Sequence, residues 1–195
     1  MAGRPKSFDM DKAVDAFVDV FWTKGYLGTS VDDLQDAAGI KRGSFYAAFG
    51  CKDDVFELVL EKYWREATEL GLRSLETERD PLKAVAQLIR HVGMFMTQNT
   101  PRGCLLLTSS SSLKFSESGH DALAVRGRMK RLETRIFDTL TRQDSDMGPE
   151  RAHSISAFTL SCLLGLNALA RNGQNREKIL AAADYSAKCV EAGLS

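Results

Sequence analysis

The residues best suited to chemistry in this chain gather in one short segment between positions 41 and 52. Its cations are Lys41, Arg42 and Lys52, and it contains no carboxylate. Ser44 offers a short hydrogen-bond donor and acceptor, and Tyr46 carries a hydroxyl that can reach a phosphate. This combination favours contacts with phosphates and base edges.

These residues are predicted to lie on the second of two short helices. Thr29 or Ser30 is a good N-cap for a helix from Val31 to Ala38, and a second helix is expected from about Lys41 to Ala48. Gly39 joins the two. This is the layout of a helix-turn-helix, whose second helix enters the major groove of DNA. On the pattern alone, an ordinary helical hairpin with a solvated charged end is the alternative.

Helical periodicity dominates the rest of the chain, and no segment alternates convincingly as a strand. One helix is predicted between Asp9 and Lys24, and a long one from about Asp53 toward Leu75. Further helices are expected over Pro81–Met96, Cys104–Phe115, Val125–Leu140, Gly148–Ala170 and Ile179–Val190. The chain is therefore expected to be all-α. A helix-turn-helix head over residues 1–55 joins a larger helical body over residues 56–195.

The composition is that of a soluble globular protein. The chain has 195 residues, of which 44% are hydrophobic and 27% charged, and its 26 basic and 26 acidic side chains give no formal net charge. Positive charge that binds a nucleic acid must therefore be local. The N-terminus leads into no apolar run, and the stretch Ile155–Ala170 is broken and short of the roughly 20 residues that span a bilayer. We expect a cytoplasmic protein with no membrane partner.

Neither a metal site nor an enzyme motif is evident. The cysteines Cys51, Cys104, Cys162 and Cys189 form no C-x-x-C pair, and no Cys/His group has zinc spacing. The chain lacks a glycine-rich phosphate loop, a G-x-S-x-G elbow and an H-E-x-x-H sequence. We therefore predict no cofactor, metal or catalytic residue. The weak alternative is an enzyme in which Cys104 pairs with His91 or His120, and no sequence motif supports it.

A longer run of residues around the two short helices follows a known order and spacing. It comprises Phe21-Trp22-Thr23-Lys24-Gly25-Tyr26, Thr29-Ser30-Val31-Asp32-Asp33-Leu34, Ala37-Ala38-Gly39-Ile40, Gly43-Ser44-Phe45-Tyr46, Phe49 and Lys52-Asp53. This run strongly resembles the first three helices, and the start of the fourth, of the tetracycline-repressor (TetR) family of transcriptional regulators. The specific resemblance covers about residues 8–60, and beyond them only helical pattern and length agree.

The resemblance implies a set of DNA contacts. Thr29 and Ser30 match positions that commonly touch the DNA backbone, and Lys52 matches a lysine that grips a phosphate. Lys41, Gly43, Ser44 and Tyr46 match the recognition helix, with Arg42 beside them, while Phe17, Phe21, Leu34, Ile40, Phe45 and Phe49 are implied to be core. Arg4 could read the minor groove, unless the N-terminal arm binds nothing. Cys51 stands at a variable position and is expected to be a spectator.

For the body, the resemblance implies a small-molecule pocket and a homodimer that binds a palindromic operator. The expected mode of action is a repressor that leaves DNA when a small-molecule ligand binds. A DNA-binding coregulator with no ligand is the alternative. Candidate lining residues are His91, Phe95, Met96, Cys104, Phe115, Met129 and Phe158, each of which could instead be core packing. Dimerisation is expected through apolar stripes on the last two helices, Ile155–Ala170 and Ile179–Val190, unless these are buried within the protomer.

Cys104 carries a second hypothesis. It follows a Pro-Arg-Gly turn and begins a predicted helix, and both a helix N-terminus and the nearby Arg102 lower the pKa of a thiol. The Gly103-Cys104-Leu105 sequence resembles a TetR subgroup in which some repressors sense electrophiles or oxidants through a cysteine. Two interpretations of Cys104 therefore stay open: a sensing thiol and a buried structural thiol.

Overall fold

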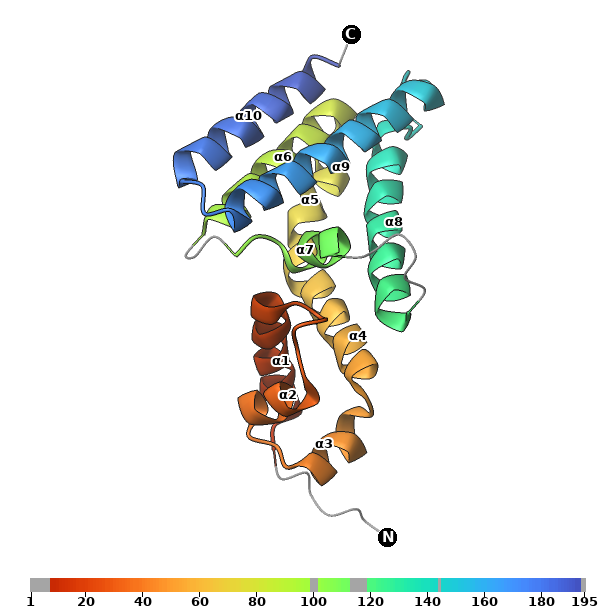
Figure 1. The fold of residues 1–195 in the computed structure, drawn as a ribbon. Helices are drawn as coiled ribbons and strands as arrows, with labels where there is room; N and C mark the ends of the chain where they lie inside the picture. Colours follow the sequence, from red (N-terminus) through yellow and green to blue (C-terminus); the bar gives the residue numbers. More distant parts are fainter. Residues whose placement is uncertain (1–7, 99–101, 113–118, 144, 194–195) are drawn as a thin grey trace.

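The computed structural model describes residues 8–98, 102–112, 119–143 and 145–193, and all regular structure within these ranges is helical (Figure 1). The all-α prediction is confirmed. The helices are α1 Met10–Lys24, α2 Val31–Ala38, α3 Arg42–Phe49, α4 Lys52–Tyr63, α5 Glu69–Thr77, α6 Pro81–Thr97, α7 Leu105–Ser112, α8 His120–Leu140, α9 Pro149–Arg171 and α10 Arg176–Glu191, with a π-helical turn, Trp64–Thr68, between α4 and α5. A head of α1, α2, α3 and the start of α4 projects from a body made of the other helices (Figure 1).

The head is built around buried aromatic rings. Phe17 of α1 packs edge-on against Phe45 and Phe49 of α3, with ring centroids 5.9 and 5.0 Å away. Phe21, one turn along α1, packs against Phe56 of α4 at 5.0 Å. The expected core residues Phe17, Phe21, Leu34, Ile40, Phe45 and Phe49 are all buried, as predicted. These contacts hold three short helices that could not persist alone.

The long helix predicted from Asp53 toward Leu75 is interrupted by the π turn. Trp64 and Leu72 are both buried, yet eight residues of regular α-helix would turn them about 80° apart. A π turn accommodates one extra residue, which brings Leu72 back to within about 20° of Trp64. The chain thus keeps one buried face from the head into the body. Residue 55, where we expect the two domains to meet, lies within α4.

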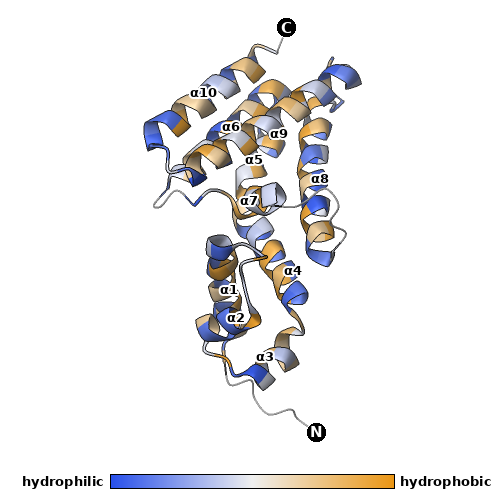
Figure 2. Cartoon of the chain, in the orientation of Figure 1, coloured by the Kyte–Doolittle hydropathy of each residue, from blue (hydrophilic) through white to orange (hydrophobic). Residues whose placement is uncertain are grey.

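Helix α10 lies along α6, and the two approach most closely at Gly93. A Cβ atom at Gly93 would lie 2.5 Å from Cβ of Ala183. Helix α9 crosses beside α6 and α10, and between its hydrophilic ends it is mostly hydrophobic or neutral (Figure 2). Among the described residues it is the one helix whose length and composition would suffice to cross a membrane.

The apolar stripes expected to bind a second copy are largely buried within the protomer, so this part of the prediction is wrong. Ile155, Leu163, Leu166 and Ala170 of α9, and Ile179, Ala183, Ala187 and Val190 of α10, are all buried in the single chain. They cover α6 and the other body helices, whose apolar faces need a partner within the same protomer. The opposite faces remain exposed, with Ala157, Ser161, Gly165 and Ala168 on α9 and Ala181 and Tyr185 on α10.

We expect Gly93→Ala to destabilise the protein by about 1 kcal/mol. Overpacking against Ala183 costs about 1–3 kcal/mol, partly offset by the gain of about 1 kcal/mol in helix propensity. The matched control is Gly127→Ala on α8, where a Cβ would meet no atom within 4 Å and stability should rise by about 1 kcal/mol. Denaturant unfolding measures both. A Gly93→Ala protein as stable as the control variant would contradict the close packing.

Candidate nucleic-acid interface and body cavity

The turn between α2 and α3 is fixed by local hydrogen bonds and one buried anchor. Ser30, rather than Thr29, caps α2: its Oγ accepts from the Asp33 backbone N–H at 3.1 Å, and its own N–H donates to Asp33 Oδ2 at 2.8 Å. Gly39 ends α2 with a φ of 64°, a left-handed conformation that favours glycine. The buried Ile40 then anchors the chain before α3 begins.

Asp33 also ties this cap to the end of α1. Hydrogen bonds from the Lys24 ammonium and from Ser30 hold the pKa of Asp33 well below its usual range. A depressed pKa in the folded state contributes stability above the unfolded value of about 3.9, and that contribution is lost as the pH falls through the folded value. The orientation of α2 is therefore maintained at neutral pH.

One face of α3 points to solvent and is basic. Lys41, Arg42 and Gly43 are exposed, Tyr46 is 44% exposed, and the Arg42 guanidinium lies 5.8 Å from the Tyr46 ring centroid. Ser44 is half-buried beside them. The opposite face carries Phe45 and Phe49 into the core. The structure thus brings the predicted recognition residues onto one surface.

Two of the predicted contact residues make hydrogen bonds within the head. The side chain of Thr29 is only 3% exposed, and its hydroxyl donates to the Gly25 carbonyl at 2.7 Å. Lys52 Nζ donates to the carbonyls of Tyr26 and Thr29, each at 3.1 Å, and lies 4.1 Å from the Tyr26 ring centroid. We therefore leave the Thr29 side chain out of the candidate interface, and Lys52 brings at most one free N–H to it. Arg4 lies outside the described residues.

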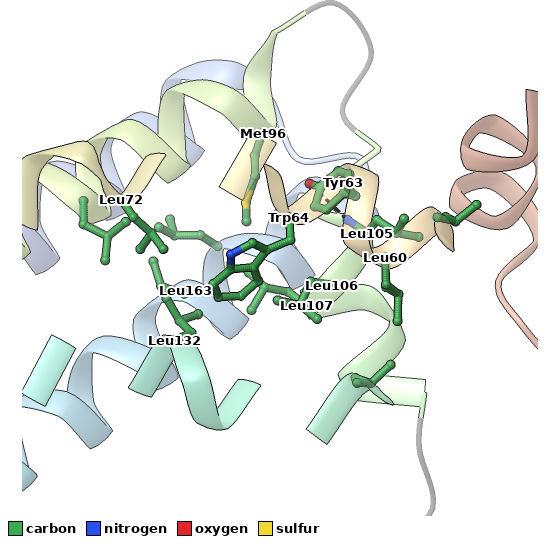
Figure 3. Close-up of a cluster of buried hydrophobic side chains, with 14 of the residues drawn as sticks. Leu60, Tyr63, Trp64, Leu72, Met96, Leu105, Leu106, Leu107, Leu132 and Leu163 are labelled. Carbon is green, nitrogen blue, oxygen red and sulfur yellow. Dashed lines mark hydrogen bonds between the residues drawn. The ribbon is translucent and has the colours of Figure 1, made fainter. Parts of the chain in front are cut away.

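The body contains a cavity of about 560 Å³, partly open to solvent, between the π turn, α5, α6 and α7. His91, Phe95 and Cys104 line it, as expected, with His91 exposed. Met96, Met129 and Phe158 are not among the lining residues, so that part of the expectation is corrected. Met96 packs beside Trp64 in the core, and Phe115 lies outside the described residues (Figure 3).

The sequence did not reveal the cavity's other walls. Leu72, Leu106, Leu107, Leu132 and Leu163 surround Trp64 and also face the cavity (Figure 3). Tyr63, residues 66–68 and residues 70–73 contribute a further wall, part of which lies on the π turn. Periodicity alone could not have found it, because a one-residue insertion in a helix leaves no clear compositional mark.

A buried polar network joins α4, α7 and α9 at one end of the cavity. The Tyr63 hydroxyl donates to Cys104 Sγ at 3.3 Å and accepts from the Leu105 N–H at 3.3 Å. Asn167, which is almost fully buried, accepts from the Cys104 N–H at 2.7 Å and donates to Thr108 Oγ1 at 3.3 Å. Polar groups this deep in an apolar core are retained because each has a partner.

This environment contradicts the expectation of an activated thiol. Burial raises the pKa of Cys104, and the hydrogen bonds to its sulfur, from Tyr63 first, only partly oppose that rise. Arg102 does not assist, because its guanidinium pairs with Asp19 at 3.0 Å and lies 4.6 Å from the Trp22 ring centroid. The expected stabilisation of the thiolate is therefore wrong, and the geometry favours a structural thiol.

A helix-turn-helix head with a basic, carboxylate-free face on α3, joined to a helical body with a largely apolar cavity, defines a DNA-binding regulator. Residues 13–59 match the model of the bacterial regulatory proteins of the tetR family. The chain is 30% identical to the HTH-type transcriptional repressor ComR of Escherichia coli over 91% of this chain and 87% of the relative. It is 29% identical to the repressor BdcR of the same organism, over 97% and 92%.

Solved structures of similar proteins point to the same family. A cysteine mutant of the TetR family transcriptional regulator CifR, complexed with 26 bp double-strand operator DNA, superimposes with a TM-score of 0.83 at 27% identity. The match covers 95% of this chain and 98% of CifR. The chain belongs to the tetR family of transcriptional regulators, and its likeness is to regulators and not to enzymes.

We expect Cys104 to alkylate more slowly than the exposed Cys51 at neutral pH. The raised pKa lowers the thiolate fraction of Cys104, and only the thiolate reacts. Its rate should keep rising with pH beyond the ordinary thiol value of about 8.5. Iodoacetamide labelling followed by peptide mass spectrometry gives the rate for each cysteine. A Cys104 that reacts fastest at pH 7 would restore the sensing hypothesis.

Proposed function

We propose that this protein is a repressor that binds a palindromic operator as a homodimer and is released by a small apolar molecule. The observation that carries the proposal is the exposed, carboxylate-free face of α3, held against the aromatic core by Phe45 and Phe49. The relatives ComR and BdcR are repressors by name, and the neighbour CifR is bound to operator DNA.

The interface we propose contains residues that position the protein on the DNA backbone and residues that read the bases. Tyr46 and the exposed Ser30 reach phosphates, which fix the register but carry no base information. Lys41, Arg42 and Ser44 stand at the start of α3, where a recognition helix meets base edges, and Gly43 permits close approach. Arg4 is proposed to enter the adjacent minor groove, and the remaining donor of Lys52 to reach a phosphate.

The homodimer we propose forms through the exposed faces of α9 and α10. On α9 this face carries Ala157, Ser161, Gly165 and Ala168, whose small side chains permit close helix approach, and on α10 Tyr185 is 73% exposed. Two-fold symmetry of this contact implies a palindromic site. A face covered by a partner also accounts for the high hydropathy of α9 in a cytoplasmic protein.

The cavity supports ligand gating over a ligand-free coregulator. Its volume of about 560 Å³ lies within the range of small-molecule sites, about 300–1,000 Å³, and seven of its 19 lining residues are leucines. We propose an effector that is largely apolar. A thiol-sensing mechanism is the less favoured alternative, because burial raises the pKa of Cys104.

Selection of bound sequences from a random duplex pool tests the operator proposal. We expect a palindrome whose half-sites lie about 34 Å or somewhat more apart, since each copy places α3 in one major groove. Tyr46→Phe should weaken binding to all sequences alike, whereas Lys41→Ala should change the preferred bases. A protein that prefers no palindrome over random duplex at moderate salt would refute the proposal.

Binding of 1-anilinonaphthalene-8-sulfonate, an amphiphilic dye with large apolar rings and one sulfonate, tests the cavity. Dye fluorescence should fall when the selected operator is added, and the factor by which DNA weakens the dye must equal the factor by which the dye weakens DNA. Leu107→Trp, inside the cavity, should remove dye binding, while Leu123→Trp, 59% exposed on α8, should leave it unchanged. Equal dye binding by the two variants would refute a ligand site in this cavity.

A further inference from the structure

Trp22 of the head lies against the wall of the body cavity. Its ring stacks on Phe95 of α6, with centroids 6.2 Å apart and planes within 12°, and meets Tyr63 of α4 edge-on at 5.2 Å. Phe95 and Tyr63 both line the cavity, whereas Trp22 does not. These two rings therefore separate any occupant of the cavity from a residue of the DNA-binding head.

Arg102 clamps this aromatic contact. Its guanidinium lies 4.6 Å from the Trp22 ring centroid, and its Nη1 donates to Asp19, one turn earlier on α1, at 3.0 Å. Arg102 comes from the segment before α7 that also contains Cys104, a cavity residue. The clamp thus links α1 to the body both through stacking and through an ion pair.

No hydrogen bond among the described residues fixes the Trp22 ring itself. Its Nε1–H is buried and lacks a partner there, so the ring is held by packing and by the cation–π contact. On the side away from the cavity, the rings of Phe95 and Tyr63 are in contact with the Trp22 ring, so an occupant that pushes them from the cavity side pushes them against Trp22. A shift of Phe95 or Tyr63 is therefore passed to Trp22.

From Trp22 the displacement has a direct route to the recognition helix. Trp22 and Phe17 lie on the same helix, α1, and Phe17 packs against Phe45 and Phe49 of α3. A tilt of α1 at Trp22 thus changes where α3 sits relative to the body. The spacing of the two α3 helices in a dimer depends on that position.

We propose that Trp22 is the positioning residue through which occupation of the cavity weakens the binding of operator DNA. Phe95 and Tyr63 are the cavity walls that move, and Arg102 is the clamp that holds Trp22. This inference rests on the proposed function, since it concerns how the ligand site regulates DNA binding. It assigns the coupling to a contact between α1 and α6 in addition to the covalent link through α4. A molecule that displaces the Phe95 ring is the class of effector that this route would sense.

A cavity-filling substitution replaces the unidentified effector in the test. Val92→Trp puts an indole beside Phe95, three residues away on α6, and Val92 lines the cavity. In the native background we expect it to weaken binding to the selected palindrome by about tenfold, within the usual range of allosteric coupling. Leu123→Trp, on the surface of α8, is the matched control and should leave operator affinity within about twofold.

The same substitution is then made in a Trp22→Leu background, which keeps an apolar side chain but removes the stacking. We expect Val92→Trp to cost less than about threefold there, because the route is cut. Arg102→Gln provides a second background, and it alters only an exposed ion pair and the clamp. This variant should fold normally and should also reduce the loss of operator affinity caused by Val92→Trp. A merely structural role for Trp22 would lower affinity in the single variant without reducing the effect of Val92→Trp.

Two results would overturn this inference. One is a Val92→Trp protein in the native background that binds the palindrome as tightly as the Leu123→Trp control, while its thermal unfolding transition shows that it is folded. The other is a Val92→Trp effect of equal size in the native, Trp22→Leu and Arg102→Gln backgrounds. Failure of the unmodified chain to select any palindrome refutes the proposed function instead, so the two failures are distinguishable.

Discussion

The packing of Phe17 against Phe45 and Phe49 is the contact on which the rest of this structure depends. Helix α3 spans eight residues and has no side-chain hydrogen bond at its N-cap, so it cannot be stable by itself. Only the burial of its two phenylalanines fixes its position. Because those rings occupy one face, Lys41, Arg42 and Tyr46 must occupy the other. The surface that we propose faces DNA is a consequence of the core behind it.

Helix α4 extends this constraint into the body. Its first turns bury Val55 and Phe56 in the head, and its last residue, Tyr63, lies in the body core. The π turn then keeps Leu72 on the buried side and leaves room for a cavity. One continuous element therefore links the head, which carries the proposed DNA-binding surface, to the wall of the body cavity.

The head could be predicted from the sequence almost in full, whereas the body could not. Caps and glycine turns fix α1 and α2 locally, the apolar stripe of α1 marks Phe17 as core, and the family resemblance implied the same for Phe45. The roles of Lys52 and Thr29 depend on carbonyls brought together by folding, and no local pattern shows them. The cavity walls, the half-buried position of Cys104 and the inward stripes of α9 and α10 depend on which helix packs on which. Periodicity identifies an apolar face but not its partner.

Methylation interference on the selected palindrome is the most direct test of the account, because it reports contacts in the major groove. Modified guanine N7 atoms should block binding in two symmetric patches about one helical turn apart, one for each copy of α3. Arg42→Ala should remove the interference at specific guanines in both patches together. Interference confined to one patch, or to minor-groove positions alone, would contradict the claim that two copies of this α3 read the operator.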